Sequence, residues 1–201
     1  VSGPPFAEDG IALVPMRRTR LVTERLVLRE WSRDDGDRAF LFDMYRRPEV
    51  RRYLGDGRVM VDAAEVDALL DRWAGLADGV LGVRAVATPG GTRLGSVLLK
   101  RIPWSTGVSD GRPDDVEIGW HFHPDAWGDG HATEAAAAVM GLARDHGIRR
   151  IVAVTNPANT ASGAVAERIG LHPAGETRDY YDTTCALYVS HDDDEVSVER
   201  T

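Results

Sequence analysis

The amino-acid sequence predicts a single α/β domain of the α+β type, in which a mixed, mostly antiparallel central sheet of about six or seven strands is flanked by about four helices. The chain has 201 residues, of which 43% are hydrophobic, so it can bury one sizeable core. Between residues 20 and 190, segments with strand periodicity alternate with segments of helix periodicity, and neither a repeat nor a linker interrupts them. Residues 1–19 mix proline, glycine and charge without periodicity and residues 191–201 form an acidic tail, so both ends are expected to be mobile.

The first half of the domain contains one strand and two helices. Residues 23–31 (TERLVLREW) form the strand, because leucines at alternate positions share one face. Ser32 can cap the first helix, which Pro48 interrupts, and Asp62 can cap the second helix. The apolar stripes of the two helices consist of Phe40, Leu41, Met44 and Tyr45 and of Val66, Leu69, Leu70 and Trp73.

The second half begins with a hairpin. Strands at residues 80–88 and 92–102 are joined by PGG, which is a hairpin signal. After a polar loop at residues 105–115, the segment 116–123 (VEIGWHFH) alternates strictly and is expected to be a strand with one polar face. The remaining elements are a helix at residues 132–146, a strand at 150–155, a helix at 159–169 and strands at 175–181 and 186–190.

Composition excludes several classes of partner. The formal net charge is −8, whereas a protein that binds a phosphate backbone shows a basic stripe, and the only short basic run is MRRTR at residues 16–20. We therefore expect no nucleic-acid partner, and an acceptor that is neutral or cationic. Cys185 is the single cysteine, so no disulfide framework exists and a reducing compartment fits. No run of 18 apolar residues and no signal peptide is visible, which predicts a soluble, cytoplasmic protein without a membrane partner.

The turn WGDGHATEA, at residues 127–135, lies between the polar-faced strand and an alanine-rich helix. A strand that runs into Gly-x-Gly and then a helix leaves backbone N–H groups unpaired at the positive end of the helix dipole, and glycine lets an anion approach them closely. Two glycines can equally serve only to turn the chain. The lysine of a Walker loop is missing, and the motif follows four strands instead of the first strand of a dinucleotide fold.

The run VEIGWHFHPDAWGDGHATEA, followed by NPANTASGAVAERIGL, resembles the GNAT superfamily of N-acyltransferases, and within it the branch that includes the N-terminal acetyltransferases of ribosomal proteins. The strand TERLVLREW is similar to the opening strand of that branch, and the resemblance covers residues 20–190. It implies a GNAT-like domain that moves an acetyl group from acetyl-CoA to a primary amine by direct attack in a ternary complex. The acceptor can be a protein N-terminus or a small amine. Another acyl-CoA as donor and a homodimer both remain open.

The resemblance also implies that the donor's pyrophosphate lies on the amides of the turn. The family pattern Q/R-x-x-G-x-G/A falls on residues 127–132, where Trp127 replaces Gln or Arg and His131 replaces an aromatic residue. Asp129 stands where basic residues are usual, and its carboxylate repels a pyrophosphate unless it points to solvent. The residues expected to bind the donor are Phe122, His123, Trp127, Gly128, Asp129, Gly130, His131, Ala132, Thr133, Asn159 and Ser162.

In the second block, Asn159 and Ser162 match the family's contacts to the pantetheine arm, although Asn159 can also simply cap its helix. Ala166 stands where many members carry a tyrosine that protonates the leaving thiolate. Ser162, or Tyr180 and Tyr181, are the candidates to replace this acid. The thiolate, whose free pKa is about 8.5 or below, can also leave without much help.

Glu117 is the candidate general base, because it lies on the polar face of the strand that should border the thioester, where several relatives carry a catalytic glutamate. The alternative is a glutamate solvated at the strand edge or paired with an arginine. The oxyanion donor is expected to be a backbone N–H between Trp120 and Phe122.

His121 and His123 share the face of Glu117, but an H-x-H pair without a third ligand nearby does not predict a metal site, and the two rings are expected to line the acceptor cleft. Cys185 is expected to be an ordinary buried thiol. The loop YLGDGRVM, at residues 53–60, can form one wall of the acceptor site.

Three functions remain open. The first is an N-acetyltransferase for a protein N-terminus or a small amine such as a polyamine or an aminoglycoside. The second is a non-catalytic or regulatory acyl-CoA-binding protein, which Asp129 and Ala166 make conceivable. The third is a structural or interaction protein that keeps only the fold.

Overall fold

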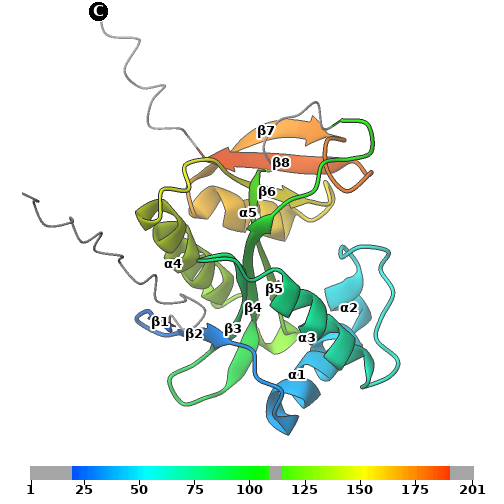
Figure 1. Cartoon of the computed structure of the whole chain (residues 1–201), viewed down its shortest axis with the longest axis vertical. Coiled ribbons are helices and arrows are strands. Elements are labelled where there is room, and N and C mark those ends of the chain that lie inside the picture. Colours follow the sequence, from blue (N-terminus) through cyan, green and yellow to red (C-terminus); the bar gives the residue numbers. More distant parts are fainter. Residues whose placement is uncertain (1–19, 109–114, 191–201) are drawn as a thin grey trace, which may run out of the picture.

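An eight-stranded sheet runs through the part of the chain that the computed structural model describes, residues 20–108 and 115–190 (Figure 1). In spatial order its strands are β1 (Leu21–Val22), β2 (Val27–Glu30), β3 (Gly82–Ala87), β4 (Arg93–Arg101), β5 (Val116–Phe122), β6 (Ile151–Thr155), β8 (Cys185–Ser190) and β7 (Leu171–Thr177). All neighbours are antiparallel except β5 and β6, which are parallel. The mixed, mostly antiparallel sheet and the hairpin of β3 and β4 are therefore confirmed.

Two strand predictions need correction. The predicted strand 23–31 is two short strands, because Thr23 closes a turn: its N–H donates to the Leu26 carbonyl over 2.9 Å, and β1 folds back on β2. The predicted strand 175–181 instead begins at Leu171 and ends at Thr177, because the chain turns at Tyr181, whose φ is +59°. The predictions for the two chain ends and for most of the loop 105–115 lie outside the described residues.

Five α-helices and one 3-10 turn lie within the described ranges: α1 (Asp35–Tyr45), α2 (Pro48–Arg51), α3 (Glu65–Gly75), α4 (His131–Asp145), α5 (Thr160–Arg168) and the turn η2 (Pro124–Ala126). Helix α2 was not predicted from the sequence, because Pro48 ends the preceding pattern and also fits the first turn of the next helix. The Ser32 cap is wrong: Asp34 caps α1, accepting the Asp37 N–H over 2.7 Å. The Asp62 cap is also wrong: the N-cap of α3 is Ala64, without a side-chain capping bond, and Asp62 instead accepts the Ala64 N–H over 2.9 Å in the turn before the helix.

The helices cover the two faces of the sheet unequally. Helix α4 packs on β4 and β5, and its alanines share one apolar cluster with Ile118, Ala166 and Leu171. Helices α1, α2 and α3 form a second cluster around Met44 and Leu70, and they lie on the other side of the sheet from α4 in Figure 1. The end of this second face is filled by a smaller group of Ile102, Val152 and Tyr180.

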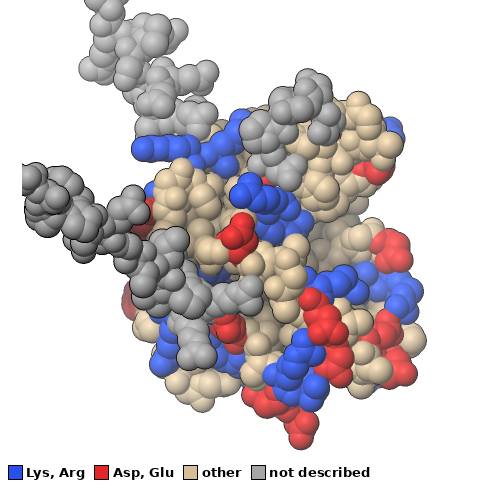
Figure 2. All heavy atoms as spheres, in the orientation of Figure 1, with Lys and Arg blue, Asp and Glu red and all other residues tan. Residues whose placement is uncertain are grey.

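Charged side chains of both signs lie next to one another over the region of α1, α2 and α3 (Figure 2). Arg38 pairs with Asp67 over 2.9 Å, and Arg58 pairs with Glu65 at the start of α3. On the face that Figure 2 draws, this region is therefore mixed in charge instead of uniformly acidic, although the whole chain carries a formal charge of −8.

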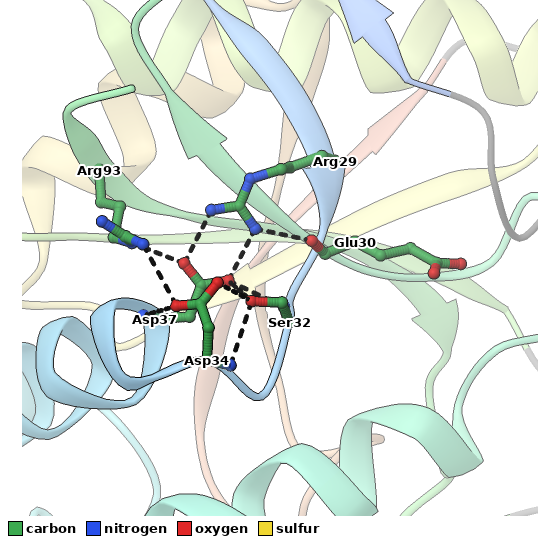
Figure 3. Close-up of polar contacts among 6 residues, drawn as sticks. All are labelled: Arg29, Glu30, Ser32, Asp34, Asp37 and Arg93. Carbon is green, nitrogen blue, oxygen red and sulfur yellow. Dashed lines mark hydrogen bonds and ion pairs between the residues drawn. The ribbon is translucent and has the colours of Figure 1, made fainter. Parts of the chain in front are cut away.

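A buried carboxylate joins the start of α1 to the sheet (Figure 3). Asp37 is fully buried and accepts two hydrogen bonds of 2.7 Å from Arg29, one of 2.5 Å from Arg93 and one of 2.8 Å from the Ser32 N–H. Burial alone raises the pKa of a carboxyl, but these donors outweigh it and hold the pKa of Asp37 well below its usual range. The network thereby attaches α1 to β2 and to the start of β4.

Strands β5 and β6 pair only at their beginnings, through Val116 with Ile151 and Glu117 with Val152. Beyond Glu117 the register of β5 continues with β4 alone, up to Phe122. The two parallel strands therefore separate toward their carboxyl ends, which is where the glycine turn follows β5.

Candidate functional site

A cavity of about 1370 Å³ lies at this separation, and it is larger than the roughly 300–1,000 Å³ of most single-ligand pockets. The glycine turn, the first turns of α4 and α5, the end of β5 and the segment 48–54 supply its walls. The predicted donor-binding residues that line it are Phe122, Trp127, Gly128, Asp129, Gly130, His131, Ala132, Thr133, Asn159 and Ser162. His123 and Glu117 are not among the described residues of its lining.

The glycine turn presents backbone donors to this cavity. Gly128 has φ of +88° and Gly130 has φ of +77°, a left-handed conformation that side chains with a Cβ rarely adopt. Gly130 is the N-cap of α4, and no side chain of the described residues caps the helix there. The N–H groups of His131, Ala132 and Thr133 therefore lack partners within the helix, at the positive end of a 15-residue dipole. This arrangement suits an anion.

Arg25 is the residue that sequence reasoning missed at this turn. Its Nη1 donates to the Asp129 carbonyl over 2.9 Å, and its Nε pairs with Glu134 over 2.7 Å. Glu134 also accepts from the Arg25 N–H and from the Thr23 hydroxyl, so the turn between β1 and β2 is bound to the first turn of α4. Arg25 lines the cavity and brings a positive charge next to the acidic position 129. Nothing local in the sequence links positions 25 and 134.

Three side chains of the turn contact its own backbone or solvent. Trp127 is 51% exposed, and its indole N–H donates to the Phe122 carbonyl over 2.9 Å. His131 Nδ1 lies 3.4 Å from the Ala126 carbonyl. Asp129 is exposed. The anion-binding capacity of the turn therefore comes from its amides and from Arg25.

The start of α5 forms the facing wall. Asn159 caps this helix, its Oδ1 accepting the Ser162 N–H over 3.3 Å, and both residues line the cavity. Ala166 is 1% exposed and packs in the core, so α5 offers no proton donor at that position. Tyr180 is also buried: it stacks on Trp104 and donates to Asp115 over 2.5 Å.

Glu117 lies in a charged cluster away from the described cavity lining. It is 7% exposed, and its Oε2 is 2.8 Å from Lys100 Nζ and accepts a hydrogen bond from Tyr181. Burial, together with the charge and hydrogen bond of Glu117, raises the pKa of Tyr181, so this phenol keeps its proton. The solvated strand edge that sequence analysis allowed for is therefore wrong, and the basic partner of Glu117 is a lysine.

The two histidines of β5 have different surroundings. His121 lines the cavity and its Nδ1 lies 2.7 Å from the Tyr45 hydroxyl. Burial, with smaller effects from the charges of Arg51 and Lys100, lowers the pKa of His121 to about 4, so its ring is neutral at pH 7. His123 instead bonds to Asp43 through Nε2 over 2.9 Å and caps η2. Among the described residues, no group of three His, Cys, Asp or Glu side chains could hold a metal ion.

Comparison with a family model and with solved structures points in each case to acetyltransferases. A model of the acetyltransferase (GNAT) domain matches residues 25–172. An acetyltransferase of the GNAT family from Bacillus anthracis has a TM-score of 0.64, with 20% identity over 85% of this chain and 96% of that one. RimL, a ribosomal L7/L12 alpha-N-protein acetyltransferase solved with coenzyme A, has a TM-score of 0.67, with 18% identity over 84% of this chain and 95% of that one. AAC(6′)-Ib, solved with ribostamycin and coenzyme A, has a TM-score of 0.66, with 16% identity over 87% of this chain and 97% of that one.

At these identities, the likeness to the solved structures shows a shared fold. The protein YkkB of Bacillus subtilis is 40% identical over 62 residues, which are 28% of this chain and 34% of YkkB. The chain thus matches about a third of the length of this curated relative. No helix in the described part of the chain is long and apolar enough to cross a membrane.

Proposed function

Because this chain belongs to the GNAT acetyltransferase family, we propose that it transfers an acetyl group from acetyl-CoA to a primary amine, by direct attack of the amine in a ternary complex. The observation that carries this proposal is the uncapped N-terminus of α4, preceded by two left-handed glycines and directed at a cavity large enough for two ligands. The coenzyme A in the RimL structure and the acetyl-CoA in an AAC(6′)-Ib structure support the same donor.

The residues of the cavity fit this donor. The amides of residues 131–133 would hold the pyrophosphate, because they lack partners within the helix. The guanidinium of Arg25, which also contacts Glu134 and the Asp129 carbonyl, would add a cation beside them. Arg168, the last residue of α5, also lines the cavity and adds a second cation to its lining. Asn159 and Ser162, on the opposite wall, would contact the pantetheine arm.

The acceptor amine must lose a proton as it attacks the thioester carbonyl, and the carbonyl oxygen must be stabilised as it becomes negative. Of the two candidate bases, His121 lines the cavity with a neutral ring, whereas one oxygen of Glu117 already accepts from Lys100 and Tyr181. We therefore assign proton acceptance to His121. Glu117 would act only through a water molecule or after Tyr181 moves. A backbone N–H of β5 between Trp120 and Phe122 would donate to the oxyanion.

The C–S bond then breaks, and coenzyme A leaves as a thiolate. The Ser162 hydroxyl lines the cavity from the first turn of α5 and is the candidate donor to this sulfur, since Ala166 has no proton to give. Free thiols have a pKa of about 8.5, so the thiolate needs only modest help.

The proposal is tested by titrating the full chain with acetyl-CoA in a calorimeter and then measuring free thiol release with a panel of primary amines. We expect saturable binding and amine-dependent release of one thiol per acetyl group transferred. Absence of saturable binding would contradict the proposal outright. Binding without thiol release from any amine would favour the second candidate, a regulatory acyl-CoA-binding protein, which the burial of Ala166 and the occupied carboxylate of Glu117 make worth testing.

A further inference from the structure

The cavity has a second end, away from the glycine turn, which we call the acceptor end: the lining residues of segment 48–54 together with Trp120 and His121. From it we infer that the acceptor is a primary amine on an apolar body, with no second positive charge close to the reacting amine. The inference rests on the proposed function, because the glycine turn and α5 are assigned to the donor and leave this end for the amine.

Apolar and aromatic side chains dominate the acceptor end. Pro48, Val50 and Leu54 come from α2 and the turn after it, and Tyr53 adds a ring there. Val50 is buried, and Leu54 packs against the apolar cluster of α1 and α3. The core therefore holds this part of the wall in place, and its side chains can make van der Waals contacts with an apolar ligand but few hydrogen bonds.

The charges of the cavity do not suit a polycation. Three described lining residues carry carboxylates, and two of them, Asp129 and Glu134, lie at the glycine turn. Glu134 is already bonded to Arg25. At the acceptor end the single carboxylate, Glu49, is accompanied by the cation Arg52 and lies 3.9 Å from Arg47. Glu49 is therefore already accompanied by cations, so an ammonium group on the acceptor lacks a free carboxylate partner, and a polyamine or an aminoglycoside would bury several such groups where a monoamine brings one.

Apolar walls also help the chemistry. An ammonium group that loses water beside hydrocarbon has a lowered pKa, so a larger fraction of the bound amine is the neutral nucleophile. The neutral ring of His121 at the same end accepts the remaining proton without adding a repelling charge beforehand. A second ammonium group on the acceptor would add to the cost of desolvation without contributing to the attack.

The test compares two amines on the full chain saturated with coenzyme A: phenethylamine, which has one amine and an apolar body, and spermidine, which is a polyamine. We expect phenethylamine to bind at least tenfold more tightly by calorimetry, and to give at least tenfold higher kcat/KM in thiol release with acetyl-CoA. A second comparison uses two short peptides, one that begins with leucine and one that begins with lysine. Turnover of the leucine peptide alone would identify a peptide N-terminus as the source of the amine.

A charge variant tests the acceptor end directly. Leu54→Glu adds a carboxylate there, so the preference for phenethylamine over spermidine should fall by at least tenfold while the donor Kd stays the same. Leu76→Glu adds the same charge at an exposed position after α3, outside the described cavity lining, and should keep the wild-type preference. If Leu54→Glu does not fold, as judged by circular dichroism, the wild-type comparison still decides.

The outcomes separate the two proposals. Tighter binding or faster acetylation of spermidine by the wild type overturns the acceptor class but leaves the acetyltransferase proposal standing. Tight binding of phenethylamine without thiol release from any amine overturns the proposed function but keeps the acceptor class. Failure of all four amines to bind overturns the acceptor class.

Discussion

Glu117 and His121 lie on the same face of β5, four residues apart and so roughly 13 Å from each other along the strand. Lys100 and Ser96 stand opposite them on β4, so each has a different neighbour. Glu117 lies beside an ammonium and a phenol, whereas His121 lies beside a phenol at the cavity wall. Residue type alone favours the carboxylate as the base, and position favours the imidazole.

Variants at these two positions distinguish the bases. His121→Gln keeps a hydrogen-bonding side chain but removes basicity, so we expect kcat to fall about a hundredfold with an unchanged donor Kd. Glu117→Gln should lower kcat less than about fivefold. The wild-type rate between pH 5 and about 11 should follow the acceptor amine, with a limb near 8 for an α-amine or near 10.4 for an ε-amine, because His121 is already deprotonated in this range. The reverse ranking of the two variants would return the role of base to Glu117.

The same imidazole should make the fold sensitive to acid. The pKa of His121 is about 4 in the folded protein and about 6.5 in an unfolded chain. Between these values the unfolded chain binds a proton that the folded protein does not, so stability falls as the pH drops from 6.5 toward 4. Each pKa unit corresponds to about 1.4 kcal/mol, and partial exposure of the ring reduces the sum, so we expect a loss of roughly 1–2 kcal/mol.

Urea unfolding at pH 7 and pH 4.5 measures this loss. His121→Gln cannot make this contribution, so its free energy of unfolding should fall by roughly 1–2 kcal/mol less than that of the wild type over the same interval. Other acidic groups titrate in both proteins and cancel in the difference. Identical pH dependence in the two proteins would mean that His121 is solvated in the folded state.

At the scale of elements, the glycine turn and the first turn of α4 act as one unit. Gly130→Val forces a Cβ into a left-handed backbone at the cavity and obstructs an anion's approach to the amides, so the donor Kd should rise at least tenfold. Gly147→Val is the matched control: its φ of +76° gives the same backbone strain after the end of α4, outside the described cavity lining. Donor Kd values of both variants, measured by calorimetry, separate the effect of backbone strain from the effect of obstructing the anion. Equal donor Kd values in Gly130→Val and Gly147→Val would mean that the anion does not bind at the glycine turn.

The hydrogen-bond network of Asp37 also acts between elements, since it joins α1 to the strands β2 and β4 (Figure 3). Asp37→Asn removes the charge partner of Arg29 and leaves Arg93 with only its 3.4 Å contact to Asp34, and both arginines are about a third exposed, so we expect a loss of about 2–4 kcal/mol in urea unfolding. The lowered pKa of Asp37 means that this stability is fully present above about pH 4 and is lost only in stronger acid.

Asp34→Asn provides the control for this measurement. Asp34 is exposed, and asparagine caps a helix about as well as aspartate, so the variant should stay close to wild type. A stability change of the same size in both variants would mean that Asp37 acts only as part of the cap.

At the scale of the whole molecule, the sequence predicts what depends on local pattern and misses what depends on distant partners. The alternation of VEIGWHFH and the glycine turn after it were sufficient to predict β5 and α4, and the turn that joins them lines the cavity. The contact of Arg25 with Glu134 spans 109 positions, and Tyr181 reaches Glu117 across 64. Neither contact has a local signal, so the cation at the turn and the burial of the expected base were not predictable.

The cavity also joins the two apolar clusters of the molecule, because its walls come from α4 and α5 on one side and from segment 48–54 on the other. The donor contacts α4 and α5 on the first side, and because it binds the folded protein and not the unfolded chain, it stabilises the folded state. At a hundred times its Kd, a ligand adds about 2.7 kcal/mol, which for a domain of this size corresponds to roughly 5–10 °C in Tm. Acetyl-CoA should produce this shift in a thermal melt, and coenzyme A should do nearly the same, because the amides and Arg25 contact the part that both share.

At the acetyl-CoA concentration that shifts the wild type, Gly130→Val should show a shift smaller by several degrees, since a tenfold rise in Kd removes about 1.4 kcal/mol of the stabilisation. Gly147→Val should melt lower than the wild type yet gain the full increment on adding the donor. Phenethylamine alone should move the melting temperature less than either nucleotide, because it contacts only the acceptor end. A full shift in Gly130→Val would mean that the donor is held by some other part of the molecule, and that the glycine turn serves only to connect β5 to α4.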